Sequence, residues 1–255
     1  MQNATTFIGI VPKAPTRSLV YAALDFEQKV ITLDQGNLGA VLAFANGQER
    51  AIAAICGPLR PNLGRMKLEA VRQALEPAPS PGRWTNYRVA EYLMRQHNLR
   101  VTRTPAKADS CPSWMQTSFE LCNRLTAAGY QNFGASDAQR QYMEVHPEAA
   151  YTVLIEKKPF PKTSLEGRVQ RQLILYDGGL EIDDPMRVFE EITRYRLKQG
   201  VLPLEGLYQA SELDALMAAF TAWLFIAHPE QISIYGDSAE GQIVLPVAGL
   251  KEKYP

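Results

Sequence analysis

Cysteine is scarce in this sequence, and no strong charge imbalance or long apolar run is evident. The 255 residues include three cysteines, Cys56, Cys111 and Cys122. An odd number at wide spacing argues against a disulfide framework or a zinc knuckle. The opening residues lack the basic start and apolar run of a signal peptide. We therefore expect a protein of the reducing cytoplasm.

Membrane and charge signals are also weak. The longest apolar candidate, residues 213–227, contains Asp214 and Thr221 and has helical periodicity, so we expect no segment to cross a membrane. Lys and Arg together number 27, as do Asp and Glu, which gives a formal net charge of zero. Nucleic acid is neither required nor excluded by this balance, because only a local basic patch could attract it.

The length and the hydrophobic fraction of 46% fit one large domain, residues 1–255, with a sizeable core. The stretch "EPAPSPG", residues 76–82, is a proline-rich break. Together with the prolines near Cys111, it predicts that residues 77–112 form an insertion or a helical subdomain outside the central sheet.

The first sixty residues predict a β-β-β-α-β order. Short β-rich runs at residues 6–10, 19–24 and 29–33 are separated by turn residues and are typical of an antiparallel meander. Apolar residues then share one helical face over residues 38–45, and residues 51–55 form a short apolar run.

The rest of the chain alternates helical patterns with three further strand patterns. The pattern predicts strands at residues 141–145, 232–235 and 242–247, the last two forming a terminal hairpin, and helices at residues 87–96, 113–128, from Pro147, 163–175, 184 to about 200, and 211–227.

The stretch "YMEVHPEAAY" places a carboxylate, Glu144, in a strand that we expect to be buried. Alternation puts Tyr142, Glu144 and His146 on one face of that strand. A buried carboxylate needs a metal, a hydrogen bond or a cation beside it. Glu144 is therefore a candidate metal ligand or general base, and pairing with an arginine is the structural alternative.

Asp214 is the second candidate acid. It lies in the first turn of the helix predicted at residues 211–227, whose small residues would allow close approach to the sheet. The alternative is local, since Ser211-x-x-Asp214 is a capping-box pattern and an acid in the first turn favours the helix dipole.

Other polar groups give weaker signals. In "GDSAEG", Asp237 and Glu240 are accessory site candidates or simply turn formers. The loop that holds Lys157, Lys158 and Lys162 could contact phosphates or be an ordinary solvated loop.

Two further patterns have ordinary structural explanations, and the second of them also suggests a chemistry. Arg88, Glu91 and Arg95 fit a surface ion-pair ladder on one helix. Cys56 and His146 follow neighbouring predicted strands, so a cysteine nucleophile with a histidine base is a third chemical hypothesis, although a cysteine there is more often inert and buried.

Several motifs occur in an order that carries a family resemblance. They are "FIGIV", "AAICGPL", "YRVAEYLMRQHNLRVTRTP", "SWMQTSFELCNRLTAAGY", "EVHPEAAY", "ELDALMAAFTAWL" and "YGDSAEGQIVLPV". The chain resembles family 429 of the domains of unknown function, a group of predicted nucleases with an RNase H-like fold, over nearly its whole length. The resemblance implies an α/β fold with a mixed five-stranded sheet of order 3-2-1-4-5, flanked by helices.

The resemblance also implies four acidic positions, of which this chain keeps two. Glu144 and Asp214 match the fifth-strand motif and the late helix, whereas Val11 and Cys56 stand where the family has aspartates. Two-metal phosphoryl transfer needs several carboxylates. We therefore expect Mg²⁺ or Mn²⁺ to be held weakly, by Glu144 and Asp214 alone. Asp25 and Asp34 are the alternative acids that could replace the two missing aspartates, but both have the sequence context of turn residues.

Three hypotheses follow. The first is a nuclease-family protein whose metal-dependent phosphodiester cleavage is weak or absent. The second is a non-catalytic binding or scaffold protein, and the third is a Cys/His hydrolase. If Glu144 and Asp214 form one site, their carboxylates should lie within about 8 Å, a span that a hydrated cation bridges.

Overall fold

The computed structural model describes residues 5–80, 82–134 and 138–255. Within these residues, eight strands form one mixed sheet. The strands are β1 (Thr5–Val11), β2 (Leu19–Leu24), β3 (Val30–Gly36), β4 (Arg50–Ile55), β5 (Gln131–Asn132), β6 (Arg140–Val145), β7 (Ser233–Asp237) and β8 (Gly241–Leu245).

Helices connect these strands and cover the sheet. The α-helices are α1 (Leu38–Asn46), α2 (Glu69–Gln73), α3 (Val89–Gln96), α4 (Ser113–Ala127), α5 (Pro147–Ile155), α6 (Leu165–Asp177), α7 (Arg187–Glu191), α8 (Arg194–Lys198) and α9 (Ala210–Ala227). In the described part of the chain, short 3₁₀ turns are η2 (Arg65–Lys67), η3 (Ala108–Ser110) and η4 (Pro229–Gln231).

The strand order is β3-β2-β1-β4-β6-β8-β7, with β5 paired to β6. β1, β2 and β3 are antiparallel neighbours, while β1, β4, β6 and β8 run parallel. The order 3-2-1-4-5 is therefore confirmed, with β6 as its fifth strand. The expected number of five strands was too small, because β5 is added and the C-terminal hairpin extends the same sheet beyond β6.

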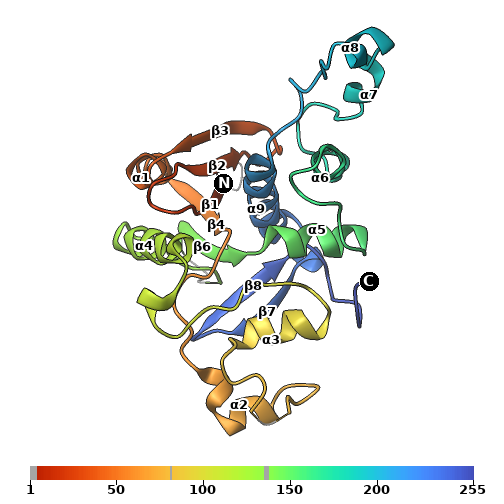
Figure 1. The fold of residues 1–255 in the computed structure, drawn as a ribbon. Helices are drawn as coiled ribbons and strands as arrows, with labels where there is room; N and C mark the ends of the chain where they lie inside the picture. The colour runs from red at the N-terminus through yellow and green to blue at the C-terminus, as the bar shows by residue number, and fades with distance from the viewer. Residues whose placement is uncertain (1–4, 81, 135–137) are drawn as a thin grey trace.

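Helices lie on both faces of the sheet, as Figure 1 shows, with α1 and α4 on one side and α5, α6 and α9 on the other. β1 is buried on both faces, as expected for a central strand. Ile8 and Ile10 pack in the cluster with α1 and α4, and Phe7 and Val11 pack in the cluster with α9.

α9 lies unusually close to β1. A Cβ atom on Gly9 would sit 1.9 Å from the carbonyl oxygen of Ala215 and 2.6 Å from the backbone nitrogen of Ala219. Only glycine allows this approach. The close contact places the first turns of α9 over the end of β1.

α9 is long and apolar enough to cross a membrane by length and composition alone. Its 18 residues have a mean hydropathy of 1.4, yet 67% of the helix is buried inside this fold. Such burial is what a core helix of a globular protein shows.

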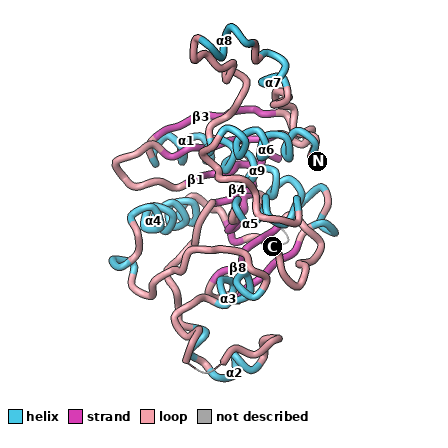
Figure 2. The backbone as a smooth tube through the Cα atoms, turned by 45° about the vertical axis from the view of Figure 1, so that its right-hand side comes forward, coloured by secondary structure: helices cyan, strands magenta, loops and turns pink. Residues whose placement is uncertain are grey.

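The segment 77–112 contains α3 and η3. α3 packs against the hairpin strands β7 and β8, and Ala90 and Met94 share an apolar cluster with Ile243 and Leu245. The segment therefore covers the far end of the sheet, and α2 lies beyond it at the edge of the molecule in Figures 1 and 2.

The single helix expected from residue 184 to about 200 is wrong. The chain forms two five-residue helices, α7 and α8, separated at Ile192 and Thr193. Thr193 ends the continuity because its backbone is extended and its side chain accepts a hydrogen bond from the Arg196 backbone, which caps α8. Figures 1 and 2 show α7 and α8 as an arm that projects from the end opposite α2.

Candidate functional site

A cavity of about 600 Å³ opens at the carboxyl ends of the parallel strands. Val11 is the last residue of β1, Cys56 follows β4, and Glu144 and His146 lie in and after β6. All four residues line the cavity. This is the edge at which open α/β sheets bind ligands.

The two predicted acids, Glu144 and Asp214, both line this cavity. Glu144 comes from β6, and Asp214 comes from the second turn of α9. Asp214 is not a helix cap, because α9 begins at Ala210 and is capped by Gln209 and Glu212. The sequence therefore identified two acids that line the same cavity; that they form one functional site, with carboxylates within about 8 Å, stays a prediction.

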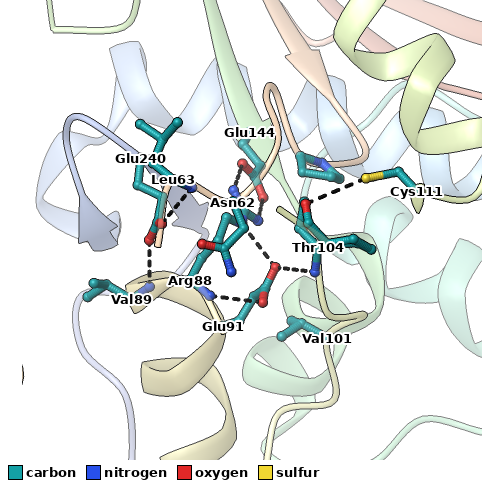
Figure 3. Close-up of polar contacts among 12 residues, drawn as sticks. Asn62, Leu63, Arg88, Val89, Glu91, Val101, Thr104, Cys111, Glu144 and Glu240 are labelled. Carbon is teal, nitrogen blue, oxygen red and sulfur yellow. Dashed lines mark hydrogen bonds and ion pairs between the residues drawn. The ribbon is translucent and has the colours of Figure 1, made fainter. Parts of the chain in front are cut away.

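The carboxylate of Glu144 forms a bidentate ion pair with the guanidinium of Arg88. The Nη1 and Nη2 atoms of Arg88 donate to the Glu144 Oε2 and Oε1 atoms at 2.8 and 2.5 Å. The Nε atom of Arg88 donates to Glu91 at 2.9 Å, and Glu91 also accepts from the Thr104 backbone. Figure 3 shows Arg88 lying between the two carboxylates. Arginine pairing, the alternative left open for Glu144, is therefore the observed arrangement.

This network is almost fully buried. The side chains of Arg88, Glu91 and Glu144 are 2%, 0% and 3% exposed. Burial alone would lower the pKa of Arg88, but the Glu144 and Glu91 carboxylates outweigh burial and raise it. Burial raises the pKa of Glu144, while the Arg88 guanidinium opposes that rise. The Arg88 guanidinium therefore stabilises the charged form of Glu144 against the effect of burial.

Asp214 has a cation of its own. The Lys162 ammonium lies 2.9 Å from Asp214 Oδ2, and Asp214 raises the pKa of Lys162. Burial raises the pKa of Asp214, and Lys162 counteracts this effect. Of the three lysines in the predicted phosphate loop, Lys162 lines the cavity, whereas Lys157 and Lys158 are exposed outside it.

Two further cations line the cavity. Lys13 donates to the Ser211 hydroxyl at 2.8 Å, and burial together with the nearby Lys162 lowers the pKa of Lys13. Arg17 lies at the exposed edge. Within the described residues, Lys13 and Arg17 have no ion pair, whereas each acid in the lining is paired. The cavity therefore carries an excess of positive charge.

The electrostatics do not favour a cysteine nucleophile. Cys56 and His146 both line the cavity, but burial raises the pKa of the Cys56 thiol well above its usual value. Burial lowers the pKa of His146 to about 4. The His146 Nδ1 atom accepts from the Ala149 backbone and caps α5. Cys56 is thus a neutral thiol, a poor nucleophile at neutral pH.

The remaining acidic candidates lie outside the cavity lining. Asp237 accepts from the turn backbone and pairs with Arg65 at 3.0 Å. Glu240 is fully buried and accepts from the backbone nitrogens of Leu63, Arg65 and Val89. Glu240 therefore joins the hairpin turn to the start of α3, which positions Arg88.

Asp25 and Asp34, the alternative acids, also lie outside the lining. Asp25 accepts from the Lys29 backbone in a turn, as expected, whereas Asp34 lies within β3. In the described part of the chain, no group of three or more His, Cys, Asp or Glu side chains is arranged to hold a metal ion.

The residues present do not fit a two-metal centre. Val11 offers no ligand atom, and a neutral Cys56 thiol suits hard cations poorly. Both Glu144 oxygens accept hydrogen bonds from Arg88, and an Asp214 oxygen accepts one from Lys162. The carboxylates that would hold a metal are already neutralised by side chains of the protein.

Sequence reasoning missed Arg88. The surface ladder predicted for Arg88, Glu91 and Arg95 is wrong, because Arg88 and Glu91 are buried. The sequence contained one partial signal, since Glu144, an acid expected to be buried, needs a cation, a metal or a hydrogen bond, but this does not specify which basic residue is the partner. Lys13 and Arg17 were also missed. They follow β1, whose last residue is Val11 where the family resemblance implies an aspartate.

Comparison with known proteins adds a family. A family model described as "Protein of unknown function (DUF429)" matches residues 47–240, which is more than half of the chain. No curated protein matches the chain.

Proposed function

The chain belongs to the DUF429 family, and from that premise we propose that its cavity binds a phosphate-bearing ligand without a divalent metal. Metal-dependent phosphodiester cleavage by the protein is weak or absent. The protein is then a binding member of a nuclease-like fold rather than an efficient hydrolase.

One observation supports this proposal most strongly: side chains of the protein neutralise both acids that a metal would need. Arg88 engages both oxygens of Glu144, and the pair is buried. A cation that displaced Arg88 would leave a buried guanidinium with Glu91 as its remaining acidic partner. Such an exchange is costly, since an unpaired buried charge destabilises a protein by several kcal/mol.

The positive excess supports an anionic ligand. Lys13, Arg17 and Lys162 reach the cavity from the loop after β1 and the loop before α6. Their charges would act in a partly enclosed space, where they are screened less than at an open surface. The volume of about 600 Å³ suits a small molecule of nucleotide size.

Binding is tested by calorimetry with adenosine 5′-monophosphate and with inorganic phosphate, in the presence of EDTA. We expect binding that added Mg²⁺ leaves unchanged, and about tenfold weaker binding in Lys13→Met because one charge contact is lost. Lys157→Met, which removes an exposed lysine outside the cavity, is the matched control and should bind as the unmodified protein does. Equal weakening by both variants, or no binding by the unmodified protein, would contradict the proposal.

Cleavage is tested with short single-stranded and duplex DNA and RNA in Mg²⁺, Mn²⁺ or chelator. We expect slow or no turnover that prefers Mn²⁺, which tolerates fewer or softer protein ligands. Val11→Asp combined with Cys56→Asp should create or raise metal-dependent cleavage. Robust Mg²⁺-dependent turnover by the unmodified protein that is lost in Glu144→Ala would overturn the proposal. If neither cleavage nor ligand binding is found, the scaffold hypothesis remains.

A further inference from the structure

Positive charge is concentrated in one part of this neutral chain. Residues 57–112 contain ten Lys and Arg residues and four Asp and Glu residues. The other residues therefore contain 17 basic and 23 acidic side chains. A block with this excess, in a protein without net charge, creates a local field that attracts anions.

Most of these cations lack an acidic partner. Among the described residues, only Arg65 and Arg88 of the ten form ion pairs. Of the four acids in the block, Glu91 is fully buried with Arg88 and does not offset charge at the surface. The exposed side chains of this block therefore carry an excess of positive charge.

Three of the unpaired cations line one cavity of about 250 Å³. They are Lys67, Arg103 and Lys107, and all three are exposed. The lining also contributes hydroxyl and amide groups from Thr85, Asn86 and Ser110, and among the described residues it includes no acidic and no large apolar side chain.

A buried asparagine holds this cavity together. The Asn62 backbone nitrogen donates to the Pro105 carbonyl at 3.2 Å, and its side-chain nitrogen donates to the Asn86 carbonyl at 3.0 Å. The Asn62 side-chain oxygen accepts from the Gly64 backbone at 2.6 Å. Asn62 is 4% exposed. It joins its own segment to the loops at Asn86 and Pro105, so the backbone segments that carry Lys67, Arg103 and Lys107 are held together before any ligand binds.

We propose that this basic surface, formed by Lys67, Arg103, Lys107 and the polar groups between them, binds the sugar-phosphate backbone of a nucleic acid. Protein partners usually bury an apolar centre, which this lining lacks. Lys, Arg, Ser, Thr and Asn side chains are the groups that contact nucleic-acid phosphates and sugars. Such contacts are independent of base sequence.

The basic surface is separate from the larger cavity. Val101 and Thr102 line the larger cavity, while Arg103 and Pro105 line the smaller one, so the same loop divides them. A substitution at Arg103 or Lys107 therefore removes no group from the proposed phosphate pocket. The two proposals can fail independently.

The test is fluorescence anisotropy with labelled 20-nucleotide single-stranded DNA, single-stranded RNA and duplex DNA, in EDTA, over about 50–200 mM KCl. The variant Arg103→Glu with Lys107→Glu should weaken binding at least about tenfold and reduce the salt slope by about 2. Its matched control is Lys157→Glu with Lys158→Glu, which makes the same change in net charge on another exposed loop. That control should stay within about twofold of the unmodified protein.

Each of the following outcomes either supports or overturns nucleic-acid binding by the basic surface. Selective loss in the Arg103 and Lys107 variant, with unchanged thermal unfolding and unchanged adenosine monophosphate binding, supports the basic surface. Equal loss in both variants shows an effect of net charge alone and overturns the inference. No nucleic-acid binding by the unmodified protein, or binding of polyphosphate or an acidic peptide in its place, also overturns it.

Discussion

Replacing Arg88 with methionine probes the buried network directly. Methionine keeps an unbranched side chain but removes the charge that Glu91 and Glu144 share. Three hydrogen bonds, at 2.9, 2.8 and 2.5 Å, are lost at once. Both carboxylates are almost inaccessible to water, at 0% and 3% exposure, so solvent cannot replace the guanidinium.

Removing one partner of a buried pair costs about 3–5 kcal/mol. We therefore expect Arg88→Met to lower the free energy of unfolding by about 4 kcal/mol, or Tm by about 10 °C. Glu144→Gln should cost less, about 1–3 kcal/mol, because the amide oxygen keeps one of the two hydrogen bonds from Arg88 and Glu91 still balances the charge, although the amide nitrogen faces the other Arg88 donor. Adding Glu91→Gln and Glu144→Gln to Arg88→Met should recover part of the loss.

The assay is urea unfolding at pH 7, with chelator and with Mn²⁺. Mn²⁺ should stabilise Arg88→Met, because the two freed carboxylates then offer hard oxygen ligands, and should leave the unmodified protein unchanged. The reasoning would be refuted by an Arg88→Met protein within about 1 kcal/mol of the unmodified protein. Equal stabilisation of both proteins by Mn²⁺ would refute it as well.

Three other outcomes are expected. Gly9→Ala should destabilise the protein by about 3 kcal/mol in urea unfolding, because its Cβ atom would lie 1.9 Å from the Ala215 carbonyl oxygen and overpack the contact between β1 and α9. Gly249→Ala is the control and should be neutral, because its Cβ atom would have nothing within 4 Å. Burial holds the pKa of His146 at about 4, below its unfolded value, so its contribution to stability is present above pH 6.5 and is lost as pH falls toward 4. His146→Asn, which keeps a capping side chain, should therefore remove about 2 kcal/mol of the stability change between pH 7 and pH 5, and an unchanged pH profile would contradict this. Trypsin, followed by mass spectrometry, should cut first between residues 187 and 198, because that arm projects from the body, and first cuts within β1, β4 or β6 would contradict the fold.

The central sheet was predictable from sequence because its signals are local. Short β-branched runs with turn residues between them define β1, β2 and β3, and the apolar run of β4 follows a single helix. The family resemblance supplied the order of these strands. The extension of the sheet by β8 was not predictable. Its pairing with β6 consists of two residue pairs, and the paired residues lie about one hundred positions apart along the chain.

The candidate site was predicted only in part. The ordered motifs identified Glu144 and Asp214, which both line the cavity. Their cationic partners were not identified, because Arg88 and Lys162 lie 56 and 52 residues away along the chain and nothing local indicates which basic side chain pairs with which acid. The capping pattern at Ser211 was misleading, since Gln209 and Glu212 supply the cap two residues earlier.

The central claim is that side chains of this protein stand where a metal would otherwise bind. Its most direct test is a crystal soaked in Mn²⁺ and measured at the manganese absorption edge. We expect no anomalous peak beside Glu144 or Asp214, with Arg88 and Lys162 still in contact with them. A manganese peak within about 2.5 Å of a Glu144 or Asp214 carboxylate oxygen, with Arg88 or Lys162 displaced, would contradict the account.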